Sequence, residues 1–128
     1  MLNTDIIPDL DTEEAIDAIW QKGIIVDGYD PEKYRQDAAG AWMMKNKYGD
    51  RTSMYGWEID HVFPSSLGGE NHFANLRPLN WRNNESKSDD YPNYESAVTA
   101  DGNQNKEETV GKTVNPSLQK ILKEIYSL

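Results

Sequence analysis

The sequence predicts one α+β domain in which two short strands and a helix at the centre of the chain are flanked by a helix toward each end. The length of 128 residues suits one domain rather than two. Helical spacing of apolar residues recurs near both ends of the chain, whereas 58–63 and 76–79 have the length and composition of strands. Pro64 is expected to end the first of these strands, and a polar loop is expected to join the two.

The N-terminal part is predicted to hold a flexible lead, a helix and a short strand. Residues 1–10 are expected to be flexible. The helix is predicted to begin with Asp11 as its N-cap and Glu14 as the capping-box partner, and Gly23 is expected to end it. Its apolar residues fall on one face: Ile16, Ile19 and Trp20. The apolar run at 24–26 then predicts a short buried strand.

The segment that leads into the centre of the chain fits two structures. Residues 27–31 combine Asp, Gly and Pro and are expected to turn. The apolar spacing over 33–48 allows a helix, but Gly40 interrupts it. Extended structure is therefore favoured at 41–45.

The C-terminal part is predicted to end in a packed helix. A surface helix is expected over 80–90, with Asn80 as a candidate N-cap. Beyond it the pattern fits a hairpin or a loop, and the polar residues 101–108 are expected to be flexible. Asn115 is expected to cap a last helix, with Pro116 at its first position. An apolar stripe of that helix is expected to face the core: Leu118, Ile121, Leu122 and Ile125.

Composition excludes several classes of protein. Hydrophobic residues make up 37% of the chain, and no apolar run approaches the roughly 20 residues of a membrane-spanning helix. The absence of cysteine excludes disulfides and any zinc site with cysteine ligands. The acidic N-terminus lacks the basic and apolar regions of a signal peptide, so a cytoplasmic location is expected.

The most informative stretch lies at the centre of the chain and combines an Asp-His pair with two later Asn residues. Its segments are Trp57-Glu58-Ile59-Asp60-His61-Val62-Phe63-Pro64, Gly68-Gly69, Asn75-Leu76-Arg77-Pro78-Leu79 and Asn84-Glu85-Ser86-Lys87. Asn75 follows His61 by fourteen residues, and Asn84 follows Asn75 by nine. This spacing can bring a carboxylate, an imidazole and a carboxamide together around one metal ion.

These residue types match the needs of phosphodiester hydrolysis. The reaction requires an activated water, neutralised phosphate charge and a stabilised leaving oxygen. Asp60 and Asn84 offer two hard oxygen ligands, which suit Mg²⁺ or Mn²⁺ better than zinc. His61 points to the other side of the strand from Asp60. An imidazole, with an unperturbed pKa of about 6.5, can take the proton of the attacking water near neutral pH.

The order of strand, loop, strand and helix, with these residues at these spacings, resembles the HNH endonuclease family. The resemblance covers residues 55–90, and all four segments of the motif occur in order. It implies that the core is a ββα-metal finger, wrapped here by the N- and C-terminal helices in a single domain spanning 1–128. It also implies products with 5′-phosphate and 3′-hydroxyl ends.

The resemblance assigns unequal roles to the motif residues. It implies that His61 is the general base and that Asp60 and Asn84 bind the metal. Asn75 is then a brace that stiffens the loop through hydrogen bonds to the backbone. The name-giving motif ends in His where this chain has Asn84, which argues against a three-His transition-metal site. A one-residue slip would make Asn83 the ligand instead.

Neighbouring residues are candidates for supporting roles. Glu58 shares the strand face of Asp60 and is expected to orient a water or to pair with a cation. His72, three residues before Asn75, either contacts the site or is an ordinary loop histidine. Four basic residues are candidates for contact with phosphate: Arg51, Arg77, Arg82 and Lys87.

We therefore expect a Mg²⁺- or Mn²⁺-dependent HNH endonuclease that acts on DNA as a monomer or a homodimer. One finger cuts one strand, so double-strand cleavage would need a dimer or two successive nicks. Two hypotheses from other classes remain open: a nucleic-acid-binding module without cleavage, and an acidic interaction protein or DNA mimic. A nuclease toxin is a variant within the enzyme class.

The formal net charge of −9 fits a nucleic-acid enzyme poorly. The charge is uneven, since residues 1–32 hold nine acidic side chains against Lys22 alone, whereas 33–51 are mostly basic. One interpretation is that the acidic ends keep the protein soluble and weaken non-specific DNA binding. The other is that an acidic surface binds a protein partner.

Overall fold

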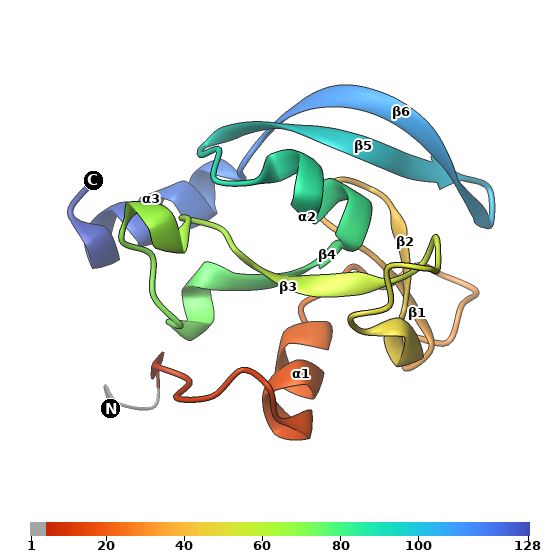
Figure 1. The fold of residues 1–128 in the computed structure, drawn as a ribbon, viewed down its shortest axis with the longest axis horizontal. Coiled ribbons are helices and arrows are strands. Elements are labelled where there is room, and N and C mark those ends of the chain that lie inside the picture. Colours follow the sequence, from red (N-terminus) through yellow and green to blue (C-terminus); the bar gives the residue numbers. More distant parts are fainter. Residues whose placement is uncertain (1–4) are drawn as a thin grey trace.

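Three α-helices and three two-stranded antiparallel sheets make up the α+β fold of residues 5–128, which the computed structural model describes (Figure 1). The helices are α1 (Glu13–Trp20), α2 (Trp81–Lys87) and α3 (Pro116–Tyr126). The strands are β1 (Tyr34–Gln36), β2 (Trp42–Met44), β3 (Trp57–His61), β4 (Leu76–Asn80), β5 (Asn93–Asp101) and β6 (Gln104–Thr113). Each odd-numbered strand pairs with the next strand along the chain. No helix within residues 5–128 combines the length and apolar character that a bilayer crossing demands.

The central strands and the helix predicted after them are confirmed and form one continuous unit. β3 and β4 pair so that Asp60 lies opposite Arg77 and Trp57 lies opposite Asn80. Asn80 ends β4 and also caps α2, because its side-chain oxygen accepts a hydrogen bond from the Arg82 amide at 2.9 Å. α2 therefore follows β4 without a loop.

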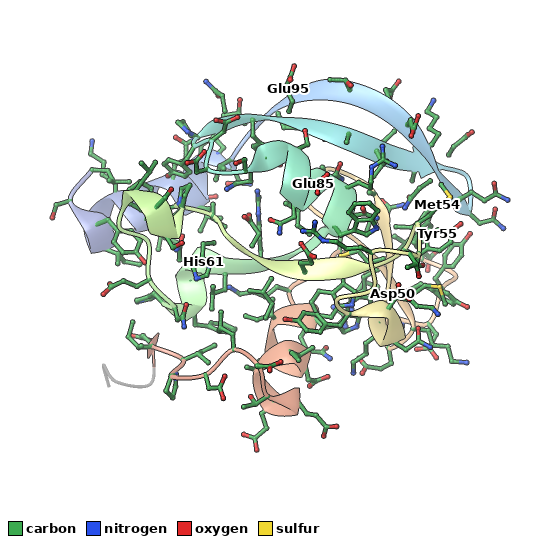
Figure 2. The ribbon with its side chains drawn as sticks, in the orientation of Figure 1. Asp50, Met54, Tyr55, His61, Glu85 and Glu95 are labelled. Atoms are coloured by element: carbon green, nitrogen blue, oxygen red, sulfur yellow. The ribbon has the colours of Figure 1, made fainter. Side chains whose placement is uncertain are left out.

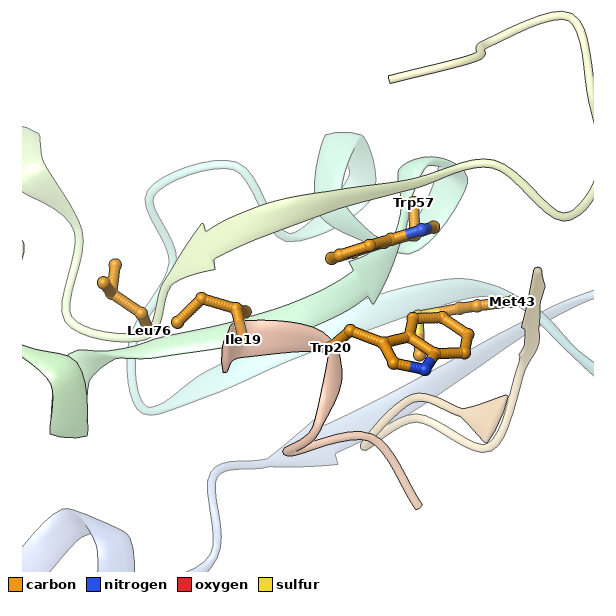
Figure 3. Packing of buried hydrophobic residues seen from close by; sticks show 5 residues of the cluster. All are labelled: Ile19, Trp20, Met43, Trp57 and Leu76. Atoms are coloured by element: carbon orange, nitrogen blue, oxygen red, sulfur yellow. The ribbon is translucent and has the colours of Figure 1, made fainter. Parts of the chain in front are cut away.

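Two hydrophobic clusters hold this unit in place. The first joins α1, β2, β3 and β4 through Ile19, Trp20, Met43, Trp57 and Leu76 (Figure 3). The ring centroids of Trp20 and Trp57 lie 5.2 Å apart. The second gathers Val62, Phe63, Tyr94, Val114 and Leu122 where the chain leaves β3. β3 therefore enters one core at its start and leads into the other at its end.

The N-terminal part differs from its prediction at the helix start. Thr12, not Asp11, is the N-cap of α1, because its Oγ1 accepts a hydrogen bond from the Ala15 amide at 3.1 Å. Asp11 instead donates its backbone N–H to Asp9 Oδ1 at 2.9 Å, within the preceding turn. Of the predicted flexible lead, residues 1–4 lie outside the described residues, and Ile7 packs on the first cluster.

The predicted buried strand at 24–26 is wrong. Ile24 makes one isolated bridge to Gln36, and the two isoleucines of the run are 50% and 61% exposed. β1 is only three residues long, and residues 24–26 pair with it only at the bridge between Ile24 and Gln36. The extended structure favoured at 41–45 is confirmed by β2, and Gly40 takes the left-handed φ of 88° in the turn before it.

The C-terminal part settles the choice between hairpin and loop as a hairpin. Of residues 101–108, 102–103 form its turn and 104–108 belong to β6, where the buried Asn105 accepts a hydrogen bond from the Trp42 amide at 2.8 Å. The predicted caps of α3, Asn115 and Pro116, are confirmed. One member of its predicted core stripe is wrong, because Ile121 is 47% exposed.

Candidate active site

The central residues of the motif meet at a cavity of about 280 Å³ between the end of β3, the loop after it and α2. Asp60, His61 and Asn84 all line this cavity. The other lining residues are Ile59, Pro64, Ser65, Ser66, Ser88 and Asp89. His61 is the last residue of β3 and lies where the strand passes into the loop (Figure 2).

The Nε2 atom of His61 contacts a side chain that no sequence pattern had indicated. Its Nε2 lies 2.8 Å from Oδ1 of Asn71, which belongs to the loop between β3 and β4. The Asn71 side-chain nitrogen donates to the Ile7 carbonyl at 3.3 Å. No sequence pattern pointed to Asn71, because its partner Ile7 is 64 residues away in the chain.

Asn75 lies where a brace is predicted to lie. It is fully buried, and its side chain closes a ring of hydrogen bonds with the backbone of Phe63: Oδ1 accepts from the amide at 2.7 Å, and Nδ2 donates to the carbonyl at 3.0 Å. Nδ2 also donates to the Glu70 carbonyl at 3.2 Å. The carboxamide therefore ties both ends of the loop that follows His61.

The two glycines of the motif have a steric reason in this loop. A Cβ atom at Gly69 would lie 1.8 Å from the Phe63 carbonyl oxygen and 3.0 Å from Asn75 Nδ2. Gly68 has a left-handed φ of 109°. Only glycine lets the loop pass this close to the chain that leaves β3.

Asp60 is buried between two cations. Its Oδ2 accepts from Arg77 Nε at 2.9 Å, and its Oδ1 lies 3.3 Å from Lys87 Nζ. Lys87 is fully buried and also donates to the His61 carbonyl at 3.3 Å. Burial lowers the pKa of Lys87, and the attraction of Asp60 offsets part of that effect.

Two predicted phosphate-binding residues are thus placed elsewhere. Arg77 and Lys87 are 9% and 0% exposed, and both charges face Asp60 rather than the surface. Arg77 follows from the strand register, which sets it opposite Asp60. Both side chains are therefore engaged by Asp60 inside the protein, which corrects their expected placement as surface groups that contact phosphate.

Asn84 lines the cavity and is hydrogen-bonded to Glu58, which does not line it. Asn84 Nδ2 donates to Glu58 Oε1 at 2.9 Å, and the amide oxygen accepts no hydrogen bond from the described residues. Glu58 also accepts from Arg51 Nε at 2.7 Å and Nη2 at 3.0 Å. The Arg51 hydrogen bonds hold the pKa of Glu58 below its usual range. Of the two alternatives for Glu58, the ion pair is the one present.

Asn83 and Asn84, the two alternatives for the metal ligand, lie in different surroundings. Asn83 is fully buried, and its Nδ2 donates to Asp37 Oδ2 and to the Val98 carbonyl, each at 3.1 Å. Its Oδ1 accepts from the Ala97 amide at 2.8 Å. Asn83 thus anchors α2 to β5, and Asn84 is the residue that faces the cavity.

The remaining candidates lie outside the cavity. His72 caps a short turn, with Nδ1 accepting from the Ala74 amide at 3.1 Å, and it does not line the cavity, so the alternative of contact with the site is not met. Arg82 pairs with Glu107 at 3.0 Å. Arg51 remains half exposed although it also contacts Glu85 at 2.9 Å. Of the four basic candidates, Arg51 and Arg82 are therefore the two at the surface.

Apart from the imidazole of His61, the side chains that could donate to a metal at the cavity offer oxygen atoms. Residues 5–128 contain no group of three or more His, Cys, Asp or Glu side chains that could hold a metal ion. A metal here would therefore depend on the Asn84 amide oxygen as well as on Asp60, with Glu58 within hydrogen-bond distance of Asn84.

Comparisons of the chain with protein-family models, with curated proteins and with solved structures give no match.

Proposed function

We propose that the protein is a divalent-metal-dependent endonuclease of the HNH type, with a ββα-metal finger at its centre, that hydrolyses phosphodiester bonds in DNA. Its main support is the convergence of Asp60, His61 and Asn84 on one cavity, with Asn75 bracing the loop between them. These residues come from a strand, a loop and a helix, so their meeting depends on the fold and not on proximity in the chain alone.

Asp60 and Asn84 fit Mg²⁺ or Mn²⁺ by chemistry. Both supply hard oxygen atoms, and within residues 5–128 the Asn84 amide oxygen accepts no hydrogen bond, while its nitrogen donates to Glu58. When bound, the ion would neutralise phosphate charge and stabilise the departing 3′ oxygen. Lys87 would have to give up its contact with Asp60 Oδ1, while Arg77 can keep Oδ2.

His61 carries the proton transfer in this proposal. Its neutral imidazole takes a proton from a water as the water oxygen forms a bond to phosphorus. The bond from phosphorus to the 3′ oxygen breaks, and that oxygen leaves as a 3′-hydroxyl once it gains a proton from solvent. The other product keeps the 5′-phosphate.

Binding of DNA is assigned to Arg51 and Arg82, the two candidate cations that keep surface exposure. Their guanidinium carbons lie 5.6 and 5.7 Å from the ring centroid of Trp81. Each is held by carboxylates, Arg51 by Glu58 and Glu85. A phosphate backbone would replace such carboxylate partners with its own oxygens.

Nicking of supercoiled plasmid tests the proposal. We expect nicking with Mg²⁺ or Mn²⁺, none with EDTA, and a loss of about 100-fold or more in His61→Ala. The matched control is His72→Ala, because His72 is the other histidine of the chain and lies outside the cavity. Cleavage that survives His61→Ala would rule out the assigned base.

The double ion pair at Asp60 favours a second candidate function, a nucleic-acid-binding module that does not cleave. In that case Arg77 and Lys87 hold Asp60 permanently, and the finger serves only as a scaffold. DNA binding by filter retention, together with no nicking in either metal, would select this candidate. Nicking that needs His61 and a divalent metal would exclude it.

A further inference from the structure

We propose that Asn71 is a positioning residue that fixes which nitrogen of His61 accepts the proton. This inference rests on the proposed function and adds a residue that lies outside the motif. The contact is the 2.8 Å approach of His61 Nε2 to Asn71 Oδ1. Asn71 itself does not line the cavity, whereas His61 does.

The orientation of the Asn71 amide follows from its second partner. A carboxamide nitrogen only donates hydrogen bonds, and a carboxamide oxygen only accepts them. The Asn71 nitrogen is used on the Ile7 carbonyl at 3.3 Å, which leaves the oxygen facing His61. A flipped amide would set its N–H groups away from that carbonyl and lose this bond.

The tautomer of His61 follows from the amide. Because Asn71 Oδ1 can only accept, the hydrogen between the two side chains belongs to His61 Nε2. A neutral imidazole has one N–H and one lone pair, so the lone pair is then on Nδ1. The Nε2 edge is directed at Asn71, outside the cavity lining, and Nδ1 is the nitrogen left for a water molecule in the cavity.

Asn71 is held in turn by the N-terminal segment. Its backbone carbonyl accepts from the Ile7 amide at 2.9 Å, and Ile6 forms an isolated bridge with His72 next to it (Figure 1). Ile7 packs against the first hydrophobic cluster. The segment before α1 therefore fixes the loop that orients the base, although neither Ile6 nor Ile7 reaches the cavity.

The test reads the ring directly by NMR of ¹⁵N-histidine-labelled protein in mildly alkaline buffer, where an ordinary imidazole is neutral. We expect the His61 signals to show a proton on Nε2, with that proton slow to exchange, and His72→Ala assigns the two histidines. In Asn71→Ala the slow Nε2 proton should disappear. Asn71→Asp should restore it, since a carboxylate oxygen also accepts.

Kinetics give the second readout. Asn71→Ala should lower kcat for plasmid nicking about tenfold with little change in KM, less than the roughly 100-fold or greater loss expected for His61→Ala. Asn71→Asp should recover part of that loss. Asn46→Ala, an exposed asparagine far from His61 in the chain, is the matched control.

The outcomes separate this inference from the proposed function. A protonated Nδ1 in the wild type, or an Asn71→Ala variant with unchanged ring signals and kcat, overturns the role of Asn71 while cleavage stands. A slow Nε2 proton that is lost in Asn71→Ala and regained in Asn71→Asp supports the ring assignment even if no nicking occurs. The NMR measurement on the wild type needs no variant to fold.

Discussion

The two sides of the cavity are built from different interactions. On the loop side, His61 is hydrogen-bonded to the side-chain oxygen of Asn71, and Asn75 is hydrogen-bonded to the Phe63 backbone, with no charged group involved. On the side of the strand and helix, Asp60 is held by ion pairs with two buried cations. The directional hydrogen bonds of the loop side fix the orientation of His61 and Asn75. The ion pairs of the other side neutralise the charge of Asp60.

This difference bears on how the proposed chemistry would begin. The loop side already has the base in place, so it needs no rearrangement to accept a proton. On the ionic side Asp60 already pairs with Arg77 and Lys87, and the carboxylates of Glu58 and Glu85 already pair with Arg51. Binding of a metal and of DNA would both proceed by exchange of ionic partners, which is where we expect substitutions to have opposite effects on stability and on binding.

The largest expected effect is on stability, at Asp60. Asp60→Ala leaves Arg77 and Lys87 buried without a counter-charge and should lower the free energy of unfolding by about 3–5 kcal/mol. Urea denaturation followed by tryptophan fluorescence measures this. Asp89→Ala is the matched control, because Asp89 lines the same cavity but is exposed. Equal free energies for the two variants would contradict the buried pair.

A smaller loss is expected on the loop side, at Asn75. Asn75→Ala removes three hydrogen bonds to the backbone and leaves buried groups of Phe63 without partners, at a cost of about 2–3 kcal/mol. Asn46→Ala, an exposed asparagine, should change the free energy of unfolding by no more than about 0.5 kcal/mol. If Asn75→Ala proves more damaging than Asp60→Ala, the ionic side is not the more strongly coupled one.

The contrast between the sides also explains what the sequence could predict. Asp60 and His61 end one strand, Asn75 ends the loop after it, and Asn84 lies in the helix that follows the next strand, so local patterns were enough to bring them together. The loop between β3 and β4 sets the register of the two strands, and the register places Asp60 opposite Arg77. That register depends on how the loop closes and is not visible in alternation alone.

Local sequence patterns could not predict contacts between segments that lie far apart in the chain. Asn71 depends on Ile7, which packs on a cluster built from four separate elements. The apolar composition of residues 24–26 predicted a buried strand, but composition does not show which segments pair. In the structure the run makes a single bridge, to Gln36. Ile121 was assigned to the core for a similar reason, since the width of the buried face of α3 is set by its neighbours.

Metal affinity is the next test of the comparison. Lys87→Met removes a positive charge 3.3 Å from Asp60 and leaves Arg77 in place, so Mg²⁺ should bind about tenfold more tightly, or about 1.4 kcal/mol. Isothermal titration calorimetry measures the change. Lys120→Met removes the same charge from the exposed face of α3 and should leave the affinity unaltered. Weaker binding in Lys87→Met would mean that Lys87 supports the ion rather than competes with it.

The smallest expected effect concerns DNA at the surface. Glu85→Gln removes one carboxylate from Arg51, an exposed pair of the kind worth less than about 1 kcal/mol, so DNA should bind about two- to threefold more tightly. Glu124→Gln changes the net charge equally but lies exposed on α3, so it isolates the local effect from the overall charge of −9. Fluorescence anisotropy over a series of salt concentrations measures both variants. An equal gain in DNA affinity in both variants would assign the effect to overall charge. If Glu85→Gln does not bind DNA more tightly, Arg51 does not belong to the DNA-binding surface.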